Sequence, residues 1–316
     1  MKILANDGIS QSGVDALEKE GFEIITTNVA QEQLEGYINK NNIVGLLVRS
    51  ATTVRKELID KCPSLKLIGR GGVGMDNIDV EYARSKGLSV INTPAASSHS
   101  VAELVFSHLF SCVRFLHDSN RNMPLEGDSN FKKLKKNYSK GTELKGKTLG
   151  VIGFGRIGQE TAKIALGIGM NVVYHDKFVG AVKINLDFIQ NQKVSFELKS
   201  SNLDDLLSNS DFISLHVPAQ KDYVISKNEF EKMKSGVGII NAARGGVINE
   251  EDLLNFIENG HISFAALDTF ENEPNPAIKV LMNPKISLTP HIGAATSEAQ
   301  DRIGLELAEQ ISSLLK

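Results

Sequence analysis

The 316-residue sequence predicts an α/β protein with two doubly wound parallel-sheet domains and a cleft between them. Three observations lead to this prediction. Short apolar runs alternate with helical patterns along the chain, which is typical of parallel strands joined by crossover helices. A glycine-rich turn at 153–158 separates a strand-like run from a helical pattern. Polar residues of catalytic type follow three later strand-like runs, at the edge where parallel sheets bind ligands.

The first hundred residues predict one compact α/β unit. Its strands are expected at 2–5, 23–25, 44–48, 67–69 and 89–92. Each helix between them is ended by a glycine, which accepts a left-handed C-cap, or by a proline, which cannot continue the helix. These helices are expected at 13–20 (ended by Gly21), 55–61 (ended by Pro63) and 80–86 (ended by Gly87).

A long amphipathic helix is predicted at 100–116, because apolar residues recur there at intervals of three and four positions. His108 falls within this apolar stripe. Residues 123–144 are expected to form an exposed connection that carries the lysine-rich run 132–136.

A second α/β unit begins at Thr148. Its strands are expected at 148–152, 171–174, 212–215, 237–241, 264–267 and 286–288. The polar segment 178–200 is predicted to be a loop with one strand near 194–198. We expect the final helix, 296–315, to return to the first unit. The domains would then be 1–97 plus 291–316, and 98–290.

The composition is that of a soluble globular protein, with 41% apolar and 23% charged residues. A net charge of -3 gives no reason to expect a nucleic-acid partner. No apolar run approaches the ~18 residues of a membrane span, and the apolar run at the N-terminus is too short for a signal peptide. Cys62 and Cys112 form no CxxC pair and are expected to be buried thiols, which favours the cytoplasm. No metal site is predicted.

The glycine-rich turn has the context of a dinucleotide-binding fingerprint, since a strand precedes it and a helix follows it. Gly153 permits the tight turn, Gly155 lets the pyrophosphate approach the backbone, and Gly158 allows close packing of helix and strand. The alternative is a structural glycine turn. Asp176 ends the next strand, where a carboxylate binds the ribose hydroxyls and repels a 2′-phosphate. The sequence therefore predicts a Rossmann-like domain with NAD as cofactor.

Two residues supply the chemistry to bind a carboxylate and to move a proton. Arg244 follows the strand at 237–241, and a guanidinium suits two-point binding of a carboxylate. His291 follows the strand at 286–288, and histidine is the natural acid–base near neutral pH. Taken singly, either residue would more often be an ordinary surface or loop residue.

Three acids follow the strand at 264–267. A carboxylate bonded to His291 would raise the pKa of the imidazole and fix its tautomer. Glu273 and Glu271 are both candidates, and chemistry alone does not choose between them. Asp268 could instead face the nicotinamide.

Several motifs together resemble the D-isomer-specific 2-hydroxyacid dehydrogenases over nearly the full length. The motifs are Arg49-Ser50 in VRSATT, Gly72-Val73-Gly74 in IGRGGVGMDN, then NTP at 92–94, SVAE at 100–103, GTEL at 141–144 and TPHIGAAT at 289–296. Within the family the resemblance is closest to the enzymes that oxidise 3-phospho-D-glycerate to 3-phosphohydroxypyruvate, the first step of phosphorylated serine biosynthesis.

The resemblance implies a role for each site residue. Arg244 would bind the substrate, Glu273 (the acid before Pro274) would pair with His291, and His291 would transfer the proton. The residues implied to line the NAD site are Val73, Gly153, Gly155, Arg156, Ile157, Gly158, Asp176, His216, Val217, Pro218, Ala242, Ala243, Arg244, Asp268, His291, Gly293 and Ala294. The discontinuous domain would bind substrate and the other domain NAD.

The resemblance also implies the substrate contacts and the assembly. Arg49, Ser50, Gly72, Val73 and Gly74 would bind the substrate together with Arg244 and His291, and Arg49 would recognise the phosphate. The helix 100–116 and the connection after it would form a homodimer interface, within a dimer or a larger homo-oligomer. The sequence ends after the helix 296–315, and we expect no C-terminal regulatory domain.

Two departures from the family pattern bear on the substrate, and two rival functions remain. Ser97 stands where relatives often carry asparagine, and Leu134 stands where they carry tryptophan. The first rival is a dehydrogenase or reductase for glycerate, glyoxylate or lactate. The second is an NAD(H)-sensing, corepressor-like binding protein, which would keep the same three catalytic residues.

Overall fold

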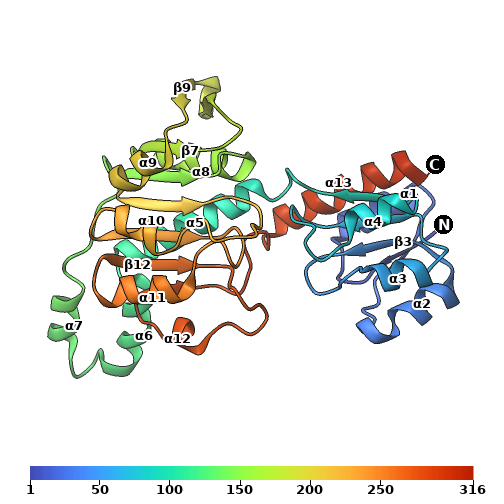
Figure 1. Cartoon of the computed structure of the whole chain (residues 1–316), viewed down its shortest axis with the longest axis horizontal. Coiled ribbons are helices and arrows are strands. Elements are labelled where there is room, and N and C mark those ends of the chain that lie inside the picture. Colours follow the sequence, from blue (N-terminus) through green and yellow to red (C-terminus); the bar gives the residue numbers. More distant parts are fainter. Residues whose placement is uncertain (316) are drawn as a thin grey trace. The chain divides into compact units, whose positions relative to one another are not determined.

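The computed structural model describes residues 1–315, which divide into two compact units. Unit 1 is Met1–Ser100 together with the chain from Ala294 onward, and unit 2 is Val101–Gly293. Each unit is a parallel sheet with helices on both faces (Figure 1), which confirms the predicted fold class. The predicted cleft between the domains stays a prediction.

Unit 1 is built on a five-stranded sheet of order β2-β1-β3-β4-β5, all parallel. The strands are β1 (Lys2–Ala5), β2 (Glu23–Ile25), β3 (Ile43–Val48), β4 (Leu67–Arg70) and β5 (Ser89–Asn92). The helices are α1 (Gln11–Lys19), α2 (Leu34–Asn41) after a 3₁₀ turn at Gln31–Gln33, α3 (Lys56–Lys61), α4 (Val80–Ser85) and α13 (Ser297–Leu315). The order reverses between β1 and β3, which makes the sheet doubly wound.

The C-terminal helix α13 belongs to the core of unit 1. Its Leu307 and Ile311 are buried in one cluster with Leu17 of α1. The two helices cross closely at paired glycines, because a Cβ on Gly13 would lie 2.8 Å from the Cα of Gly304. α2, α3 and α4 cover the opposite face of the sheet.

Unit 2 is built on a six-stranded parallel sheet of order β13-β12-β11-β10-β6-β7. The strands are β6 (Thr148–Ile152), β7 (Asn171–His175), β10 (Phe212–Leu215), β11 (Val237–Asn241), β12 (Ile262–Leu267) and β13 (Ile286–Leu288). One face is covered by α5 (Ser98–Val113) and α8 (Arg156–Gly167). The other face is covered by α9 (Leu203–Asn209), α10 (Lys227–Lys232), α11 (Glu250–Glu258) and α12 (Ile278–Leu281).

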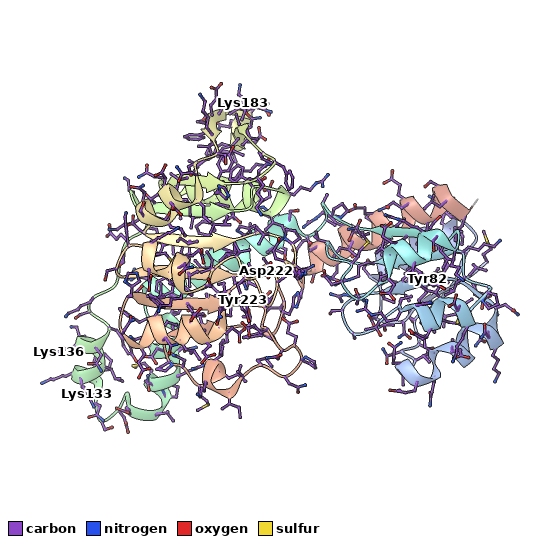
Figure 2. The ribbon with its side chains drawn as sticks, viewed as in Figure 1. Tyr82, Lys133, Lys136, Lys183, Asp222 and Tyr223 are labelled. Carbon is purple, nitrogen blue, oxygen red and sulfur yellow. The ribbon has the colours of Figure 1, made fainter. Side chains whose placement is uncertain are left out.

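Two segments of unit 2 differ from the prediction. The segment predicted as a loop with one strand is an antiparallel hairpin, β8 (Ala181–Asp187) and β9 (Lys193–Lys199), seen at the top of unit 2 in Figure 1. Its buried Ile184 and Leu186 join the core of α8, while Lys183 projects into solvent (Figure 2). The alternation of apolar and polar residues at 181–187 was the signal for the missed strand.

The connection after α5 is also more ordered than predicted. α5 ends at Val113, and Phe115 has a left-handed φ of 56° that breaks the helix before α6 (Leu116–Glu126). The lysine-rich run lies on α7 (Phe131–Asn137), where Lys133 and Lys136 extend outward in Figure 2. Within residues 1–315, none of the helices combines the length and apolar character needed to cross a membrane.

Candidate active site

The glycine-rich turn joins β6 to α8 at the carboxyl edge of the sheet of unit 2. Gly153 has φ 91°, and a Cβ there would lie 2.5 Å from the carbonyl oxygen of His216. A Cβ on Gly158 would overlap the carbonyl oxygen of Gly153. A Cβ on Gly155 would meet nothing within 4 Å, so this position faces open space at the start of α8. Two glycines are thus required by packing, and the third leaves room for a phosphate to reach the helix N-terminus.

Asp176, directly after β7, holds the glycine-rich turn. Its Oδ2 accepts a hydrogen bond from Phe154 N at 2.6 Å. Its Oδ1 accepts from Phe178 N at 2.7 Å and Val179 N at 2.9 Å. Burial raises the pKa of this carboxyl, but the three backbone donors outweigh burial and the net pKa is lowered. A carboxylate has about four acceptor positions, so one remains for a ribose hydroxyl.

The loop after β10 lies beside the turn. His216 N donates to Ile152 O at 2.7 Å, and His216 Nε2 lies 2.9 Å from Ser214 Oγ. Burial lowers the pKa of His216 to about 3, so its imidazole is neutral at pH 7. Val217 and Pro218 continue this loop, whose exposure increases from Val217 to Pro218.

Arg244 is positioned by the turn that follows β11. Asn241 closes this turn, because its Nδ2 donates to Arg244 O at 2.8 Å and its Oδ1 accepts from Ala243 N at 3.0 Å. Arg244 Nη1 donates to Ala243 O at 2.7 Å. Gly245 is required here, since a Cβ would overlap the backbone of Phe270. The sequence pattern gave no sign of the Asn241 contacts.

Glu273 and His291 form a hydrogen-bonded pair. His291 Nδ1 lies 2.8 Å from Glu273 Oε2, and both side chains are about one-third exposed, at 37% and 35%. Glu273 Oε1 accepts from Phe270 N at 2.9 Å. Burial raises the pKa of Glu273, but the bond from His291, the bond from Phe270 and the charge of Arg244 together lower it. The Glu273 carboxyl therefore stays ionised at neutral pH and holds the ring nitrogen that faces it.

Glu271, the competing acid, has a different task. Glu250 N, at the start of α11, donates to Glu271 Oε1 at 2.9 Å, and Glu271 N donates back to Glu250 Oε1 at 2.9 Å. Glu271 also raises the pKa of Tyr223, a loop residue labelled in Figure 2. The structure thus separates two acids that residue chemistry left equivalent: Glu271 ties the loop to α11, and Glu273 contacts the histidine.

Asp268, 1% exposed, anchors the segment that carries His291. Its Oδ1 accepts from Thr289 Oγ1 at 2.6 Å and from Ile292 N at 2.8 Å, and its Oδ2 accepts from Gly293 N at 2.9 Å. A Cβ on Gly293 would lie 3.1 Å from that Oδ2. Asp268 therefore holds the Thr289 side chain before His291 and two backbone N–H groups after it.

Arg49 follows β3 at the carboxyl edge of the sheet of unit 1. Asp7, after β1, holds this loop, because its Oδ2 accepts from Arg49 N at 2.6 Å and Thr52 N at 3.1 Å. Asn77 Nδ2 donates to Arg49 O at 2.8 Å. Ser50, the next predicted substrate residue, is exposed. The loop therefore has a fixed backbone beneath a partly exposed arginine.

The turn Gly72-Val73-Gly74 follows β4 at the same edge. Gly72 has φ 151°, and a Cβ there would lie 2.6 Å from Arg70 Nη1. Asn92 Nδ2 donates to Val73 O at 2.7 Å, and Thr93 N donates to Gly72 O at 3.1 Å. Val73 is 38% exposed. Loops after β3, β4 and β5 thus gather at one edge of unit 1.

One polar residue near the site was not predicted to matter. His108 of α5 is 4% exposed and bonds through its two ring nitrogens to Ser287 and Thr289. The available signal was a histidine within the apolar stripe of an amphipathic helix, because a buried polar side chain requires partners.

Comparison with known proteins identifies the family. The D-isomer specific 2-hydroxyacid dehydrogenase, NAD binding domain, matches residues 106–293. The chain is 40% identical over 316 residues to the hydroxypyruvate reductase of Thermotoga maritima, covering 98% of this chain and 97% of that protein.

Two further relatives agree. The D-3-phosphoglycerate dehydrogenase of Archaeoglobus fulgidus is 38% identical over 323 residues; the alignment covers 100% of this chain and only 58% of that enzyme. A glyoxylate reductase structure from Paecilomyes thermophila has a TM-score of 0.82 at 27% identity, covering 100% of this chain and 95% of that one. The chain belongs to the D-isomer-specific 2-hydroxyacid dehydrogenase family, and its cofactor is NAD.

Proposed function

We propose that this oxidoreductase oxidises 3-phospho-D-glycerate to 3-phosphohydroxypyruvate with NAD, the first step of phosphorylated serine biosynthesis. The observation that supports the chemistry is the Glu273–His291 pair at 2.8 Å, held by loops of the NAD-binding unit. The likeness to D-3-phosphoglycerate dehydrogenases supports the choice of substrate.

His291 is the proposed acid–base. Because the Glu273 carboxylate accepts the bond from Nδ1, the proton of a neutral His291 lies on Nδ1. Nε2 then has the free electron pair and takes the proton from the substrate hydroxyl. The negative charge of Glu273 stabilises the imidazolium that results. In reduction, the same Nε2 returns the proton to the carbonyl oxygen.

Arg244 is the proposed ligand of the substrate carboxylate and reacting oxygen, since its guanidinium can donate two parallel hydrogen bonds. Bound NAD supplies the acceptor for the hydride. The fit of this cofactor is supported by the open face of Gly155 and by the acceptor position left on Asp176. We propose that the remaining contacts to NAD are those implied by the family pattern, namely Val73, Arg156, Ile157, His216, Val217, Pro218, Ala242, Ala243, Arg244, Asp268, His291, Gly293 and Ala294.

Phosphate recognition is the step that distinguishes the proposed substrate. Arg49 has a backbone fixed by Asp7 and Asn77, and we propose that its guanidinium binds the phosphate. The turn Gly72–Gly74 is proposed to offer backbone N–H groups to the substrate carboxylate. Ser50 is proposed as a neighbouring polar contact.

A second candidate is the reduction of hydroxypyruvate or glyoxylate. It is favoured by the 40% identity to the Thermotoga maritima hydroxypyruvate reductase, which the chain matches over 97% of its length. The two candidates share Arg244, Glu273 and His291 and differ in whether Arg49 meets a phosphate.

Initial rates of NADH formation or consumption test the proposal. The pairs to compare are 3-phospho-D-glycerate with 3-phosphohydroxypyruvate, D-glycerate with hydroxypyruvate, and D-lactate. Activity on the phosphorylated pair, lost in Arg49→Gln and kept in Arg55→Gln, would support the proposal; Arg55 is a matched control because it is paired with Asp79. Activity restricted to unphosphorylated acids would favour the second candidate. NADH binding without turnover would favour an NAD(H) sensor.

We further propose a cytoplasmic homodimer. Large apolar side chains are exposed along α5, α6 and α7, namely Phe110 (46%), Leu116 (60%), Leu125 (77%) and Phe131 (56%). We propose that a second copy of the chain covers them, as the family pattern implies for these helices. The cytoplasm is supported by the two free, buried thiols, whose pKa values burial raises to about 11 for Cys62 and about 12 for Cys112.

A further inference from the structure

A hydrogen-bond network of four side chains, His108, Ser287, Thr289 and Asp268, joins α5 to the segment that carries His291. His108 Nδ1 lies 2.9 Å from Ser287 Oγ, and His108 Nε2 lies 2.9 Å from Thr289 Oγ1. Thr289 Oγ1 lies 2.6 Å from Asp268 Oδ1, the oxygen that also accepts from Ile292 N. The network thus reaches the backbone of Ile292, the residue after His291, and none of the bonds named here is to His291.

The donors and acceptors of the network determine the tautomer of His108. The Asp268 carboxylate accepts from Thr289 Oγ1, Ile292 N and Gly293 N, so the single hydroxyl proton of Thr289 is donated to Asp268. Thr289 Oγ1 must then accept, and the proton it receives is on His108 Nε2. A neutral His108 leaves Nδ1 as an acceptor for the hydroxyl proton of Ser287. In this arrangement of protons, each hydroxyl, ring nitrogen and carboxylate oxygen of the network has a hydrogen-bond partner.

The segment held by the network includes a residue with an unfavourable backbone conformation. His291 has a φ of 54°, in the left-handed region that residues with a side chain seldom adopt. Such a conformation persists only where surrounding bonds over-determine it. The bonds are His291 N to Thr289 O at 3.1 Å, and Ile292 N and Gly293 N to Asp268. Thr289 Oγ1 donates to the Asp268 carboxylate, and His108 Nε2 contacts the same hydroxyl.

Packing alone does not explain a histidine at this position. His108 lies on the buried face of α5 with Val105 and Leu109, both 0% exposed, and an aliphatic residue would fill the site without any polar group to satisfy. Burial also lowers the pKa of His108, which favours the neutral ring that the proton count requires.

We propose that His108, as the neutral tautomer protonated on Nε2, is a positioning residue that acts through Thr289 and Asp268 to hold His291 in place for proton transfer. The inference rests on the proposed role of His291. The role is indirect, since the His108 ring bonds to Ser287 and Thr289, and Thr289 bonds to Asp268.

The first test compares His108→Leu with Val105→Ala. Both changes lie on the buried face of α5, but the side chain of Val105 has no polar atom and takes no part in the hydrogen-bond network. We expect both variants to lose thermal stability. His108→Leu should also lose at least about tenfold in kcat, because small misplacements of a catalytic group are costly, with a much smaller change in KM. An unchanged kcat in His108→Leu would reduce His108 to a packing residue and overturn the proposal.

Rescue and coupling give a second test. His108→Gln places an amide N–H near the position of Nε2 and should recover part of the lost kcat. Thr289→Val removes the hydroxyl at nearly constant volume. The double variant His108→Leu/Thr289→Val should be no slower than the worse single variant, because both substitutions interrupt the same hydrogen-bond network. Full additivity of the two losses in kcat would contradict the proposed network.

A third test does not depend on turnover, so it separates this inference from the proposed function. Selective ¹⁵N labelling of histidine should show one neutral ring protonated on Nε2 between pH 6 and 8 that disappears in His108→Leu. Amide exchange at Ile292 and Gly293 should accelerate in His108→Leu and not in Val105→Ala. Protonation of His108 on Nδ1, or unchanged exchange, would overturn the inference whether or not the enzyme oxidises phosphoglycerate.

Discussion

At the scale of single residues, neighbouring acids with the same chemistry perform different tasks. Glu273 contacts His291, whereas Glu271 accepts the amide of Glu250 and returns the same kind of bond. A single residue of sequence separates them, yet the turn directs one carboxylate to the histidine and the other to the start of α11.

This difference predicts opposite outcomes for the same substitution. Glu273→Gln should lower kcat by about 10²–10³-fold, since the amide cannot stabilise an imidazolium, while NAD affinity is kept. Glu271→Gln is the matched control, because its amide oxygen can still accept from Glu250 N. We expect its kcat to stay within about twofold of the wild type, as one hydrogen-bond acceptor replaces another. Steady-state kinetics with NAD titrations measure both; equal losses would refute the assignment.

Asp176 predicts a pH-dependent contribution to stability. Its pKa in the folded protein lies below the ordinary value of 3.8. The stability it contributes is therefore fully present above that ordinary value and is lost as pH falls through the lowered pKa. Asp176→Asn should destabilise the protein by about 1.5–3 kcal/mol at pH 7, the scale of hydrogen bonds to a charged group. The difference from wild type in urea unfolding should shrink below about pH 4, as linkage requires; a constant difference would contradict it.

At the scale of elements, the glycine-rich turn allows ligand contact and packing to be separated. Gly155, with φ -70° and ψ -163°, has a conformation open to alanine and open space around its Cβ position. Gly155→Ala should therefore keep the melting temperature while weakening NAD binding by about tenfold or more, since the backbone loses its close approach to the phosphates.

Gly158→Ala is the contrasting variant. Its Cβ would overlap the carbonyl of Gly153, so we expect a loss of about 1–3 kcal/mol in unfolding free energy, the scale of an overpacked core. Thermal scans with and without NAD distinguish the two variants. Equal destabilisation of both would show that Gly155 also has a packing role.

The hairpin β8–β9 predicts a purely structural effect. Ile184 is 1% exposed in the core shared with α8. Ile184→Ala should cost about 2–4 kcal/mol in unfolding free energy through the cavity it leaves, with kcat unchanged. A loss of activity without a loss of stability would mean that the hairpin has a different role.

Most of the elements were predictable because their signals are local. Strands such as Thr148–Ile152 and Val237–Asn241 are short apolar runs with a turn at each end, and they have the predicted bounds. In the hairpin, the strand near 194–198 was predicted, but the strand Ala181–Asp187 was missed although its apolar and polar residues alternate. The break at Phe115 was missed because a left-handed bend in an apolar helix leaves no mark in residue spacing.

The sequence predicts which residues form the site, but it does not predict the hydrogen bonds that hold them. The family motifs indicate Arg244, Glu273 and His291 by position. The bonds of Glu250 and His108 join segments far apart in sequence, and periodicity contains no information about such pairs. A polar residue on an otherwise apolar helix face, as at His108, is the one sequence signal of such long-range hydrogen bonds.

At the scale of the whole molecule, the exposed apolar side chains of α5–α7 predict self-association. Leu125→Glu should shift the protein from dimer to monomer in light scattering coupled to gel filtration, because a charge on the surface that a second copy would cover is desolvated without a partner. Lys183→Glu, on the solvent-facing side of the hairpin, is the control and should leave the mass unchanged. A monomeric wild type at micromolar concentration would refute the dimer.

The bond from Phe154 to Asp176 has a consequence for the entropy of ligand capture. A glycine-rich turn would otherwise sample many backbone states, and a ligand that froze it would bear that ordering cost at the moment of association. Here the ordering is complete once the chain has folded, since a side chain from the neighbouring strand closes the turn in advance. The cofactor meets a rigid cradle, and its binding energy is available for affinity instead of for ordering the loop.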